Sequence, residues 1–589
     1  MGRWTLTPLR SLVLSCSMAA AACATTATPS TSPSPSSTQR PLRLTILHNN
    51  DGESQLLDAG SGLTDWGGVA RFKSAVDRLR AAARAGDSAE RAHDVLVLSS
   101  GDNILPGPEL TASQTRGVPL YDGLALQMIG YDAICLGNHD FDLGPDLLAD
   151  LIESTPRTQT WLSANLDFAK EPRLAAVARA GRLASRAIVT LSTGHRVGVI
   201  GLTTPTLASI STPRNVTIDP DLPAVVAREV ASLEQEGVRH IILVSHLQSI
   251  AADVRLVKEL SGVDLVIAGG GDELLANPST ALVPGDEAAP PRGDYPLRVP
   301  DRDAKLVPLV TTPGSYRYVG RLVVDMDGAG AVVGVAPSSG LVRIAGGAAP
   351  DASAEDPTVI REVTGPLTQA LRAQRTNVVG TTEVPLVGVR AKIRAEETNL
   401  GNLVADALAW YATQVAKEHG VSAPRVALVN GGGIRNDSVL PVGDLTELDT
   451  FNILPFPNSV SVAPEVPATK LAEILGHAAR HAGRGAFLQV SGLVVTHDRD
   501  EGDLLDVTLA DGTAIVRDGR VVAGAPAVGV ATISFLAKGG GGAPFEGLTY
   551  SNLGASYQQA LARYIETGLS GRITAARYPR AGSGRIIAR

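Results

Sequence analysis

The chain has 589 residues, of which 44% are hydrophobic and 19% are charged, so it is expected to fold around more than one core. It carries 52 basic and 60 acidic residues, a net charge of -8, which disfavours nonspecific binding to a nucleic-acid polymer or an anionic membrane. These values predict a globular protein of two or three domains.

The first 40 residues do not have the pattern of a folded domain. Two arginines precede a short apolar stretch, residues 11–23, and a Ser/Thr/Pro-rich segment follows it. This order predicts a secretory signal over residues 1–23 and a flexible tether over residues 24–40. We therefore expect the protein outside the cytoplasm, in the periplasm or at the cell surface.

Cysteine usage refines this expectation. Cys23 directly follows a run of alanines and resembles the lipid-modified cysteine of bacterial lipoproteins. We therefore predict a lipid anchor at Cys23, which would be the protein's link to a membrane, with plain export as the alternative. Cys16 would leave with the signal, so Cys135 would be alone in the mature chain, and no intramolecular disulfide is expected.

From residue 41 the sequence alternates between short apolar runs and helical stretches. Residues 67–86 and 221–237 have helical periodicity. Runs of about six apolar residues that end in polar or glycine positions are typical of buried strands. These runs are "LRLTILHN", "HDVLVLSSGD", "YDAICLGNHD", "HRVGVIGLT", "RHIILVSHL" and "VDLVIAGGG". The alternation predicts an α/β sandwich in which a parallel sheet delivers polar residues to one edge.

The remaining segments predict the domain organisation. Residues 276–303 are rich in Pro, Asp and Ala and are expected to form a surface excursion. Residues 356–374 predict a linking helix, apart from an interruption at Gly365-Pro366, and a second α/β segment follows from Val379. The predicted parts after the tether are residues 41–345, a linker over 346–378, a second domain over 379–577 and a tail over 578–589.

The expected strand ends carry the residue types that bind divalent cations. Oxygen ligands with one or two imidazoles suit a pair of hard or borderline cations, and Asp102 could bridge the two ions. Each residue alone is more often a helix cap or a turn residue, but their succession favours a metal site. The candidates are Asp51, Glu53, Asp102, Asn138, His139, Asp142, His246, Asp272 and Glu273.

These motifs resemble a known family. "DGE", "SGDN", "GNHDFD", "SANL", "SHL" and "AGGGDE" follow the order of the dimetal calcineurin-like metallophosphoesterases. "ETNLGNLVADAL", "NGGGIRND" and "LPFPNS" then resemble the 5′-nucleotidase family, which includes bacterial periplasmic UDP-sugar hydrolases. The resemblance implies an N-terminal four-layer αββα metallophosphoesterase sandwich and a C-terminal α/β substrate-binding domain, joined by a linking helix. It also implies two divalent cations (Mn, Mg, Ca or Zn) and a small-molecule phosphoester substrate.

Roles are carried over position by position. The resemblance implies that His139 is the catalytic histidine and that Asp142 orients its ring. The implied mechanism is in-line attack of metal-activated water on phosphorus, with His139 assisting the leaving oxygen. The positions that correspond to metal ligands are Asp51, Glu53, Asp102, Asn138, His246 and Glu273.

Three positions of the implied metal site depart from the family pattern. Glu53 stands where the family usually has histidine, while Gly271 and Glu273 stand where it has two further donors. One interpretation is an oxygen-rich site that favours Mn²⁺, Mg²⁺ or Ca²⁺ over Zn²⁺. The other is a weakly bound second metal with low or absent activity.

The C-terminal half contains candidate substrate contacts. Glycines before Arg435 allow close approach of an anion, which a guanidinium can bind in bidentate fashion. Phe456 and Phe535 correspond to an aromatic clamp for a nucleobase, whereas Gly541 stands where the family has a carboxylate that binds ribose. The predicted substrate-binding residues are Asn430, Arg435, Phe456, Asn458, Phe535 and Arg394.

Three functions remain open at this point. The first is an extracytoplasmic, metal-dependent phosphoesterase that hydrolyses nucleotides or related small phosphoesters. The second is a cell-surface protein that binds such compounds with little or no catalysis, motivated by Glu53 and Gly271. The third is a hydrolase of cyclic nucleotides or nucleotide sugars.

Overall fold

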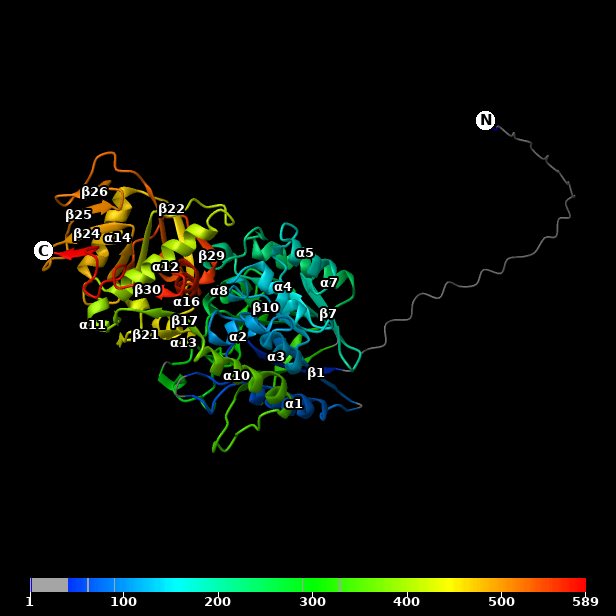
Figure 1. Cartoon of the computed structure of the whole chain (residues 1–589). Helices are drawn as coiled ribbons and strands as arrows, with labels where there is room; N and C mark the ends of the chain where they lie inside the picture. Colours follow the sequence, from blue (N-terminus) through cyan, green and yellow to red (C-terminus); the bar gives the residue numbers. More distant parts are fainter. Residues whose placement is uncertain (1, 3–40, 61–62, 89, 289, 328–329) are drawn as a thin grey trace, which may run out of the picture. The chain divides into compact units, whose positions relative to one another are not determined.

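A computed structural model describes residues 2, 41–60, 63–88, 90–288, 290–327 and 330–589. The predicted signal, tether and lipid attachment at Cys23 fall outside these residues. The chain from Arg40 to Arg589 forms one compact unit (Figure 1). Among the helices of the described residues, none is long and apolar enough to cross a membrane.

The amino-terminal half contains two large sheets. In the first, β1 is parallel to β2, and β14 lies antiparallel to β1 on its other side. The order of this sheet is β15 (Val332–Val335), β14 (Tyr318–Met326), β1 (Leu42–Asn49), β2 (Ala92–Ser99), β3 (Ala133–Cys135), β4 (Thr160–Leu162) and β6 (Leu183–Ala184), with β16 (Gly340–Arg343) also paired to β14. The order of the second is β12 (Leu297–Pro300), β13 (Leu306–Val310), β11 (Leu265–Gly269), β10 (His240–His246), β8 (Arg196–Thr203) and β7 (Arg186–Thr190).

Side chains along β1 and β2 point alternately into two different cores, one on each face of the first sheet. Leu44 and Ile46 belong to the core shared with the second sheet, whereas Leu47 belongs to the core under the helices. A strand that is buried on both faces becomes apolar at nearly every position, as the sequence pattern indicated. Helices therefore cover the outer faces. They are α1 (Val69–Arg84), α3 (Tyr121–Ile129) and α4 (Pro145–Glu153) for the first sheet, and α7 (Leu222–Gln235) and α8 (Ile250–Val257) for the second.

Two sequence expectations for this half were wrong. The polar strand ends come from two sheets rather than from one parallel sheet, because His246 ends β10 in the second sheet. Residues 276–303 are not a simple surface excursion. Val283 and Tyr295 are buried in the core, His48 Nε2 lies 2.7 Å from Tyr295 Oη, and β12 pairs with β13. Scattered apolar side chains anchor this proline-rich segment.

The linking helix is continuous where an interruption was expected. It consists of α9 (Pro357–Val359), a π-helical turn at Ile360–Thr364 and α10 (Gly365–Gln374). A Cβ on Gly365 would lie 2.7 Å from the Ile360 carbonyl oxygen, so the position needs glycine. The π turn accommodates Pro366, which lacks the N–H of a regular helix. α10 packs against α2 (Pro108–Arg116).

The carboxyl-terminal half is built around one principal sheet. Its order is β23 (Leu488–Ser491), β19 (Val426–Asn430), β28 (Val528–Ile533), β22 (Ser459–Val466) and β29 (Ser551–Ser556). α12 (Asn399–Val415) packs on this sheet, because its buried residues recur at helical spacing. The other main helices are α13 (Glu447–Ile453), α14 (Ala468–Arg480), α15 (Ser534–Ala537) and α16 (Tyr557–Arg563).

Smaller sheets complete this half. One has the order β21 (Gly443–Thr446), β17 (Val378–Thr382) and β30 (Arg572–Ile573), and a second pairs β18 (Leu386–Val387) with β20 (Val439–Leu440). A third has the order β27 (Arg520–Val521), β26 (Ala514–Arg517), β25 (Leu504–Leu509), β24 (Leu493–His497) and β31 (Ile586–Ala588). α14 lies against β25 (Figure 1).

The last residues are part of the fold rather than the predicted tail. β31 pairs in parallel with β24, and Tyr578 is buried. Arg585 binds the Asp406 carboxylate through two nitrogens, at 2.6 and 2.9 Å. A short strand and an internal ion pair therefore extend the carboxyl-terminal domain to residue 588.

Candidate functional site

Three buried side chains meet where the two sheets of the amino-terminal half end. Asp51 follows β1, Asp102 follows β2 and His246 ends β10. One ligand-type atom from each lies within 4.8 Å of the others. The sequence placed all three among its predicted metal ligands, and the fold brings them together from strands far apart in the chain.

The contacts of His246 decide which of its nitrogens faces the carboxylates. Its Nδ1 lies 2.6 Å from the Ser100 carbonyl oxygen, which can only accept, so Nδ1 carries the proton. Its Nε2 faces Asp102 Oδ2 at 2.9 Å. A buried nitrogen of this kind is available to a cation.

Burial and charge set the protonation of this trio. Burial raises the pKa of Asp51 to about 6, with His246 opposing the rise. Burial would also raise the pKa of Asp102, but His246 and His139 outweigh it and lower that pKa. Burial lowers the pKa of His246, but Asp102 outweighs this effect and raises the pKa to about 10. His246 thus balances part of the negative charge of the two carboxylates.

The turns that carry the carboxylates have a left-handed backbone. The φ angles are 51° at Asp51, 53° at Glu53 and 53° at Asp102. Backbone hydrogen bonds tie the turns together, among them those from Asp51 N to the Gly101 carbonyl at 2.9 Å and from Glu53 N to the Asp102 carbonyl at 3.0 Å. Side chains other than glycine rarely adopt this conformation, and clusters of such residues are typical of functional sites.

Two further predicted ligands lie close to the trio. Asn138 is buried, and its Oδ1 accepts a hydrogen bond from Gln248 Nε2. Glu53 is half-buried, and burial, with Asp51 and Asp102 nearby, raises its pKa to about 8. Their role as metal ligands stays a prediction. Gln248 was not identified from the sequence, because the Asn138 contact joins segments far apart in the chain.

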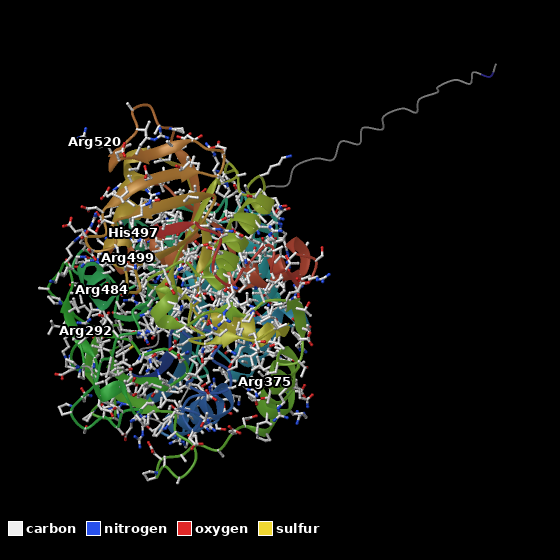
Figure 2. All side chains as sticks on the ribbon, turned by 60° about the vertical axis from the view of Figure 1, so that its left-hand side comes forward. Arg292, Arg375, Arg484, His497, Arg499 and Arg520 are labelled. Carbon is white, nitrogen blue, oxygen red and sulfur yellow. The ribbon has the colours of Figure 1, made fainter. Side chains whose placement is uncertain are left out.

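Glu273, also predicted as a ligand, is held by other groups. One oxygen accepts the Ile250 N–H at the start of α8, at 2.5 Å, and the other lies 3.2 Å from Arg292 Nε. Arg292 itself is exposed at the outer surface (Figure 2). Glu273 is not part of the close group formed by Asp51, Asp102 and His246.

The predicted catalytic histidine is braced on both sides. His139 Nδ1 lies 2.6 Å from Asp142 Oδ2, and the His139 backbone N–H donates to Asp102 Oδ1 at 2.7 Å. Burial lowers the pKa of His139, but Asp142 and Asp102 outweigh it and raise the pKa to about 10. Asp142 also accepts a hydrogen bond from Ser211 Oγ at 2.8 Å, a partner that the sequence did not reveal.

The predicted substrate-binding residues line one cavity of about 740 Å³ in the carboxyl-terminal half. All six contribute to it: Arg394, Asn430, Arg435, Phe456, Asn458 and Phe535. His481 and Arg484 line it too, and sequence reasoning missed them because they follow α14 with no recognisable motif. Arg484, labelled in Figure 2, adds a third guanidinium to the cavity.

The cavity offers aromatic faces and unpaired polar groups. Phe456 and Phe535 are 39% and 42% exposed, which is high for phenylalanine. Two of its polar atoms, Asn430 Oδ1 and Arg394 Nε, are buried and have no hydrogen-bond partner in the described chain. Such groups must find a partner in a ligand or solvent, since an unmade buried hydrogen bond is unfavourable. Gly541 also lines the cavity, so no carboxylate stands there.

Comparisons with known proteins agree with this geometry. Residues 378–549 match the family described as "5'-nucleotidase, C-terminal domain". The chain is 29% identical over 481 residues to Protein 5NUC of Lutzomyia longipalpis, with 78% of each chain covered. It is 29% identical over 482 residues to the 5'-nucleotidase of Bos taurus, covering 79% of this chain and 77% of that one.

A solved structure agrees over a greater length. The 5'-nucleotidase precursor from Thermus thermophilus superposes with a TM-score of 0.56 and 29% identity, covering 93% of this chain and 99% of that one. The similarity therefore runs through both halves of the chain. The chain is thus similar to 5′-nucleotidases over most of its length, and its second half contains the match to the 5′-nucleotidase C-terminal domain.

Proposed function

We propose that this protein is a metal-dependent phosphoesterase that hydrolyses 5′-nucleotides or related small phosphoesters outside the cytoplasm. The observation that carries the proposal is the group formed by Asp51, Asp102 and His246, which gathers three buried donors within 4.8 Å. The cavity that contains Arg435 and two exposed phenylalanines supports a substrate with a phosphate and a flat ring.

The residues present fit a divalent cation. His246 Nε2 is buried, and the carboxylates of Asp51 and Asp102 lie beside it. Two oxygen donors with one imidazole suit Mn²⁺, Mg²⁺, Ca²⁺ or Zn²⁺, and Glu53 and Asn138 are the nearest candidates for a second ion. When bound, divalent cations would neutralise phosphoryl charge and lower the pKa of the attacking water.

The protein's own residues supply proton transfer and positioning. His139 is held by Asp142 at Nδ1, so its Nε2 is the atom that can give a proton to the leaving oxygen. Burial lowers the pKa of His139, but Asp142 and Asp102 outweigh it, which favours the protonated ring. Asp142 fixes the ring orientation, which lowers the reorganisation needed in the transition state.

The cavity of the carboxyl-terminal half favours a nucleotide whose ribose makes few contacts. A base can stack between Phe456 and Phe535, while Arg435 and Arg394 bind phosphate. Gly541 offers no carboxylate to the ribose hydroxyls, so we expect modest selectivity between nucleotides and other phosphoesters with a flat leaving group.

A binding protein with little catalysis is the second candidate. It is favoured by Gly271, which has no side chain to ligate a cation, and by Glu273, which Ile250 and Arg292 already engage. These features weaken the second metal position. The carboxylate at Glu53 and the intact contact between His139 and Asp142 favour the enzyme.

The location proposed for the protein follows from the sequence of residues 1–40. We propose export with a lipid attached to Cys23. Mass spectrometry of the mature amino terminus, together with fractionation of Cys23→Ser cells, tests this. A mature chain that begins at Met1 and stays in the cytoplasm would contradict it.

The decisive experiment measures phosphate release. Purified protein is stripped of metal and supplied with Zn²⁺, Mn²⁺, Mg²⁺ or Ca²⁺, then assayed with nucleoside monophosphates, a cyclic nucleotide, a UDP-sugar and p-nitrophenyl phosphate. We expect metal-dependent release from a nucleoside monophosphate, and a loss of at least about 100-fold in His139→Ala. Ligand binding without turnover under every cation would favour the binding protein instead.

A further inference from the structure

A chain of hydrogen bonds links the carboxyl-terminal half to the catalytic histidine proposed above. Asn552 Nδ2, on β29, donates to the Ser211 carbonyl oxygen at 2.9 Å. Ser211 Oγ donates to Asp142 Oδ1 at 2.8 Å, and Asp142 Oδ2 lies 2.6 Å from His139 Nδ1. The chain thus runs from one half of the protein into the site of the other.

Every intermediate group in this chain is buried. Asn552 is 5% exposed, Ser211 1% and Asp142 2%. Asn552 is itself oriented, because its Oδ1 accepts a hydrogen bond from Ser461 Oγ on β22 at 2.6 Å. Buried polar groups fixed on both sides have few alternative rotamers, so the chain is a rigid connection rather than a surface contact.

The contacts of Asp142 restrict the orientation of the His139 ring. Asp142 has two oxygens, and Ser211 occupies the one that His139 does not use. A carboxylate held at both oxygens cannot rotate away from the imidazole, so the ring stays aimed at the metal pocket. The Ser211 backbone follows α6 (Leu207–Ile210), which packs on β29, and Asn552 fixes its carbonyl there.

We propose that Ser211 and Asn552 are positioning residues, through which docking of β29 sets the orientation of the His139–Asp142 pair. This inference rests on the proposed phosphoesterase function. It assigns the carboxyl-terminal half a second task besides holding substrate, since Asn552 holds the Ser211 backbone and Ser211 holds Asp142. Neither residue touches the substrate or the reacting atoms. Substitutions at these residues should therefore change kcat, through the orientation of His139, more than KM.

Steady-state kinetics on p-nitrophenyl phosphate test the kinetic part of the proposal. Ser211→Ala and Asn552→Ala are each expected to lower kcat about tenfold with KM within about twofold, and Ser211→Thr, which keeps the hydroxyl, to recover most of the loss. The matched control is Ser491→Ala, which removes a serine–carboxylate bond within the carboxyl-terminal half, from Ser491 Oγ to Asp406 Oδ1 at 2.6 Å. Its kcat is expected to be unchanged.

A double-mutant cycle separates positioning from general damage to the fold. In the His139→Ala background, Ser211→Ala is expected to cause no further loss of kcat, because there is no ring left to orient. A full tenfold loss in that background, or wild-type kcat in Ser211→Ala, would overturn the proposal while leaving the phosphoesterase function intact.

A second measurement needs no catalysis. In metal-free, full-length protein, the His139 Nδ1 proton is identified by NMR as the low-field signal that disappears in His139→Ala. We expect this proton to exchange with water at least about tenfold faster in Asn552→Ala and Ser211→Ala than in Ser491→Ala. Equal exchange in all three variants would refute the connection even if the protein hydrolysed no phosphoester.

Discussion

The guanidinium carbon of Arg435 lies 4.9 Å from the centroid of the Phe456 ring, at the edge of the carboxyl-terminal cavity. A cation over an aromatic face stabilises the ring in place and leaves its other face free. The same pair therefore offers a charge for phosphate and a platform for a flat ring, two features that a nucleotide combines.

The first prediction concerns this platform. Phe456→Ala removes one stacking surface, so KM for a nucleoside monophosphate should rise roughly 5- to 100-fold. KM for p-nitrophenyl phosphate, which has a smaller ring, should rise less. Phe487→Leu serves as a control, because Phe487 is buried and does not line the cavity. Equal changes for both substrates would show that Phe456 does not contact the base.

A second prediction concerns the missing carboxylate at Gly541. Its φ of 68° is left-handed, and a Cβ there would lie 3.7 Å from Ala486 Cβ, an ordinary contact. Asp tolerates this backbone better than most residues, so Gly541→Asp should fold. We expect it to lower KM for a nucleoside monophosphate about fivefold through bonds to ribose hydroxyls.

The control for that variant is Gly541→Ala, which has the same backbone strain without the carboxylate. KM for p-nitrophenyl phosphate, which has no ribose, should be the same in both variants. If the alanine variant improved KM as much as the aspartate variant, the effect would come from the backbone.

The third prediction concerns metal affinity. His246→Ala and Asp102→Asn each remove a donor from the close group, so bound metal measured by plasma mass spectrometry after dialysis should fall, with affinity lower by more than about tenfold. Glu273→Gln should retain metal, because both oxygens of Glu273 already have partners. Loss of metal in Glu273→Gln would show that Glu273 is a metal ligand after all.

The fourth prediction concerns the carboxyl terminus. Arg585→Ala leaves the Asp406 carboxylate largely buried without its cation, so the free energy of unfolding should fall by about 3–5 kcal/mol. Removal of residues 578–589 also deletes β31 and should be at least as damaging. Thermal or denaturant unfolding checks both, with the exposed Arg580→Ala as a control. Wild-type stability after the truncation would mean that the segment is a tail after all.

Much of the fold was predictable because its strands are buried on both faces. Runs such as "LRLTILHN" and "RHIILVSHL" are apolar at nearly every position and end at Asn49 and His246, where β1 and β10 end. β12 and β31 were missed, because short strands at sheet edges are held by pairing and by a few anchors such as Tyr295 rather than by their own hydrophobicity.

Three of the predicted ligands are brought together by the fold, but their contacts were not predictable. The order of the motifs identified Asp51, Asp102 and His246, and the fold brought them together. The contacts of Gln248 with Asn138 and of Arg292 with Glu273 join segments with no recognisable spacing. Long-range pairs of this kind depend on how two sheets and a loop pack, which a single sequence does not encode locally.

The left-handed turns at Asp51, Glu53 and Asp102 mean that the geometry of this pocket lowers the stability of the folded protein. Each such residue costs about 1 kcal/mol or more of backbone strain, and glycine would relieve it. Laboratory selection for thermal stability alone should therefore favour glycine at these turns. The resulting protein would be more stable but would have lost its catalytic activity. Selection must include turnover if the chemistry is to survive.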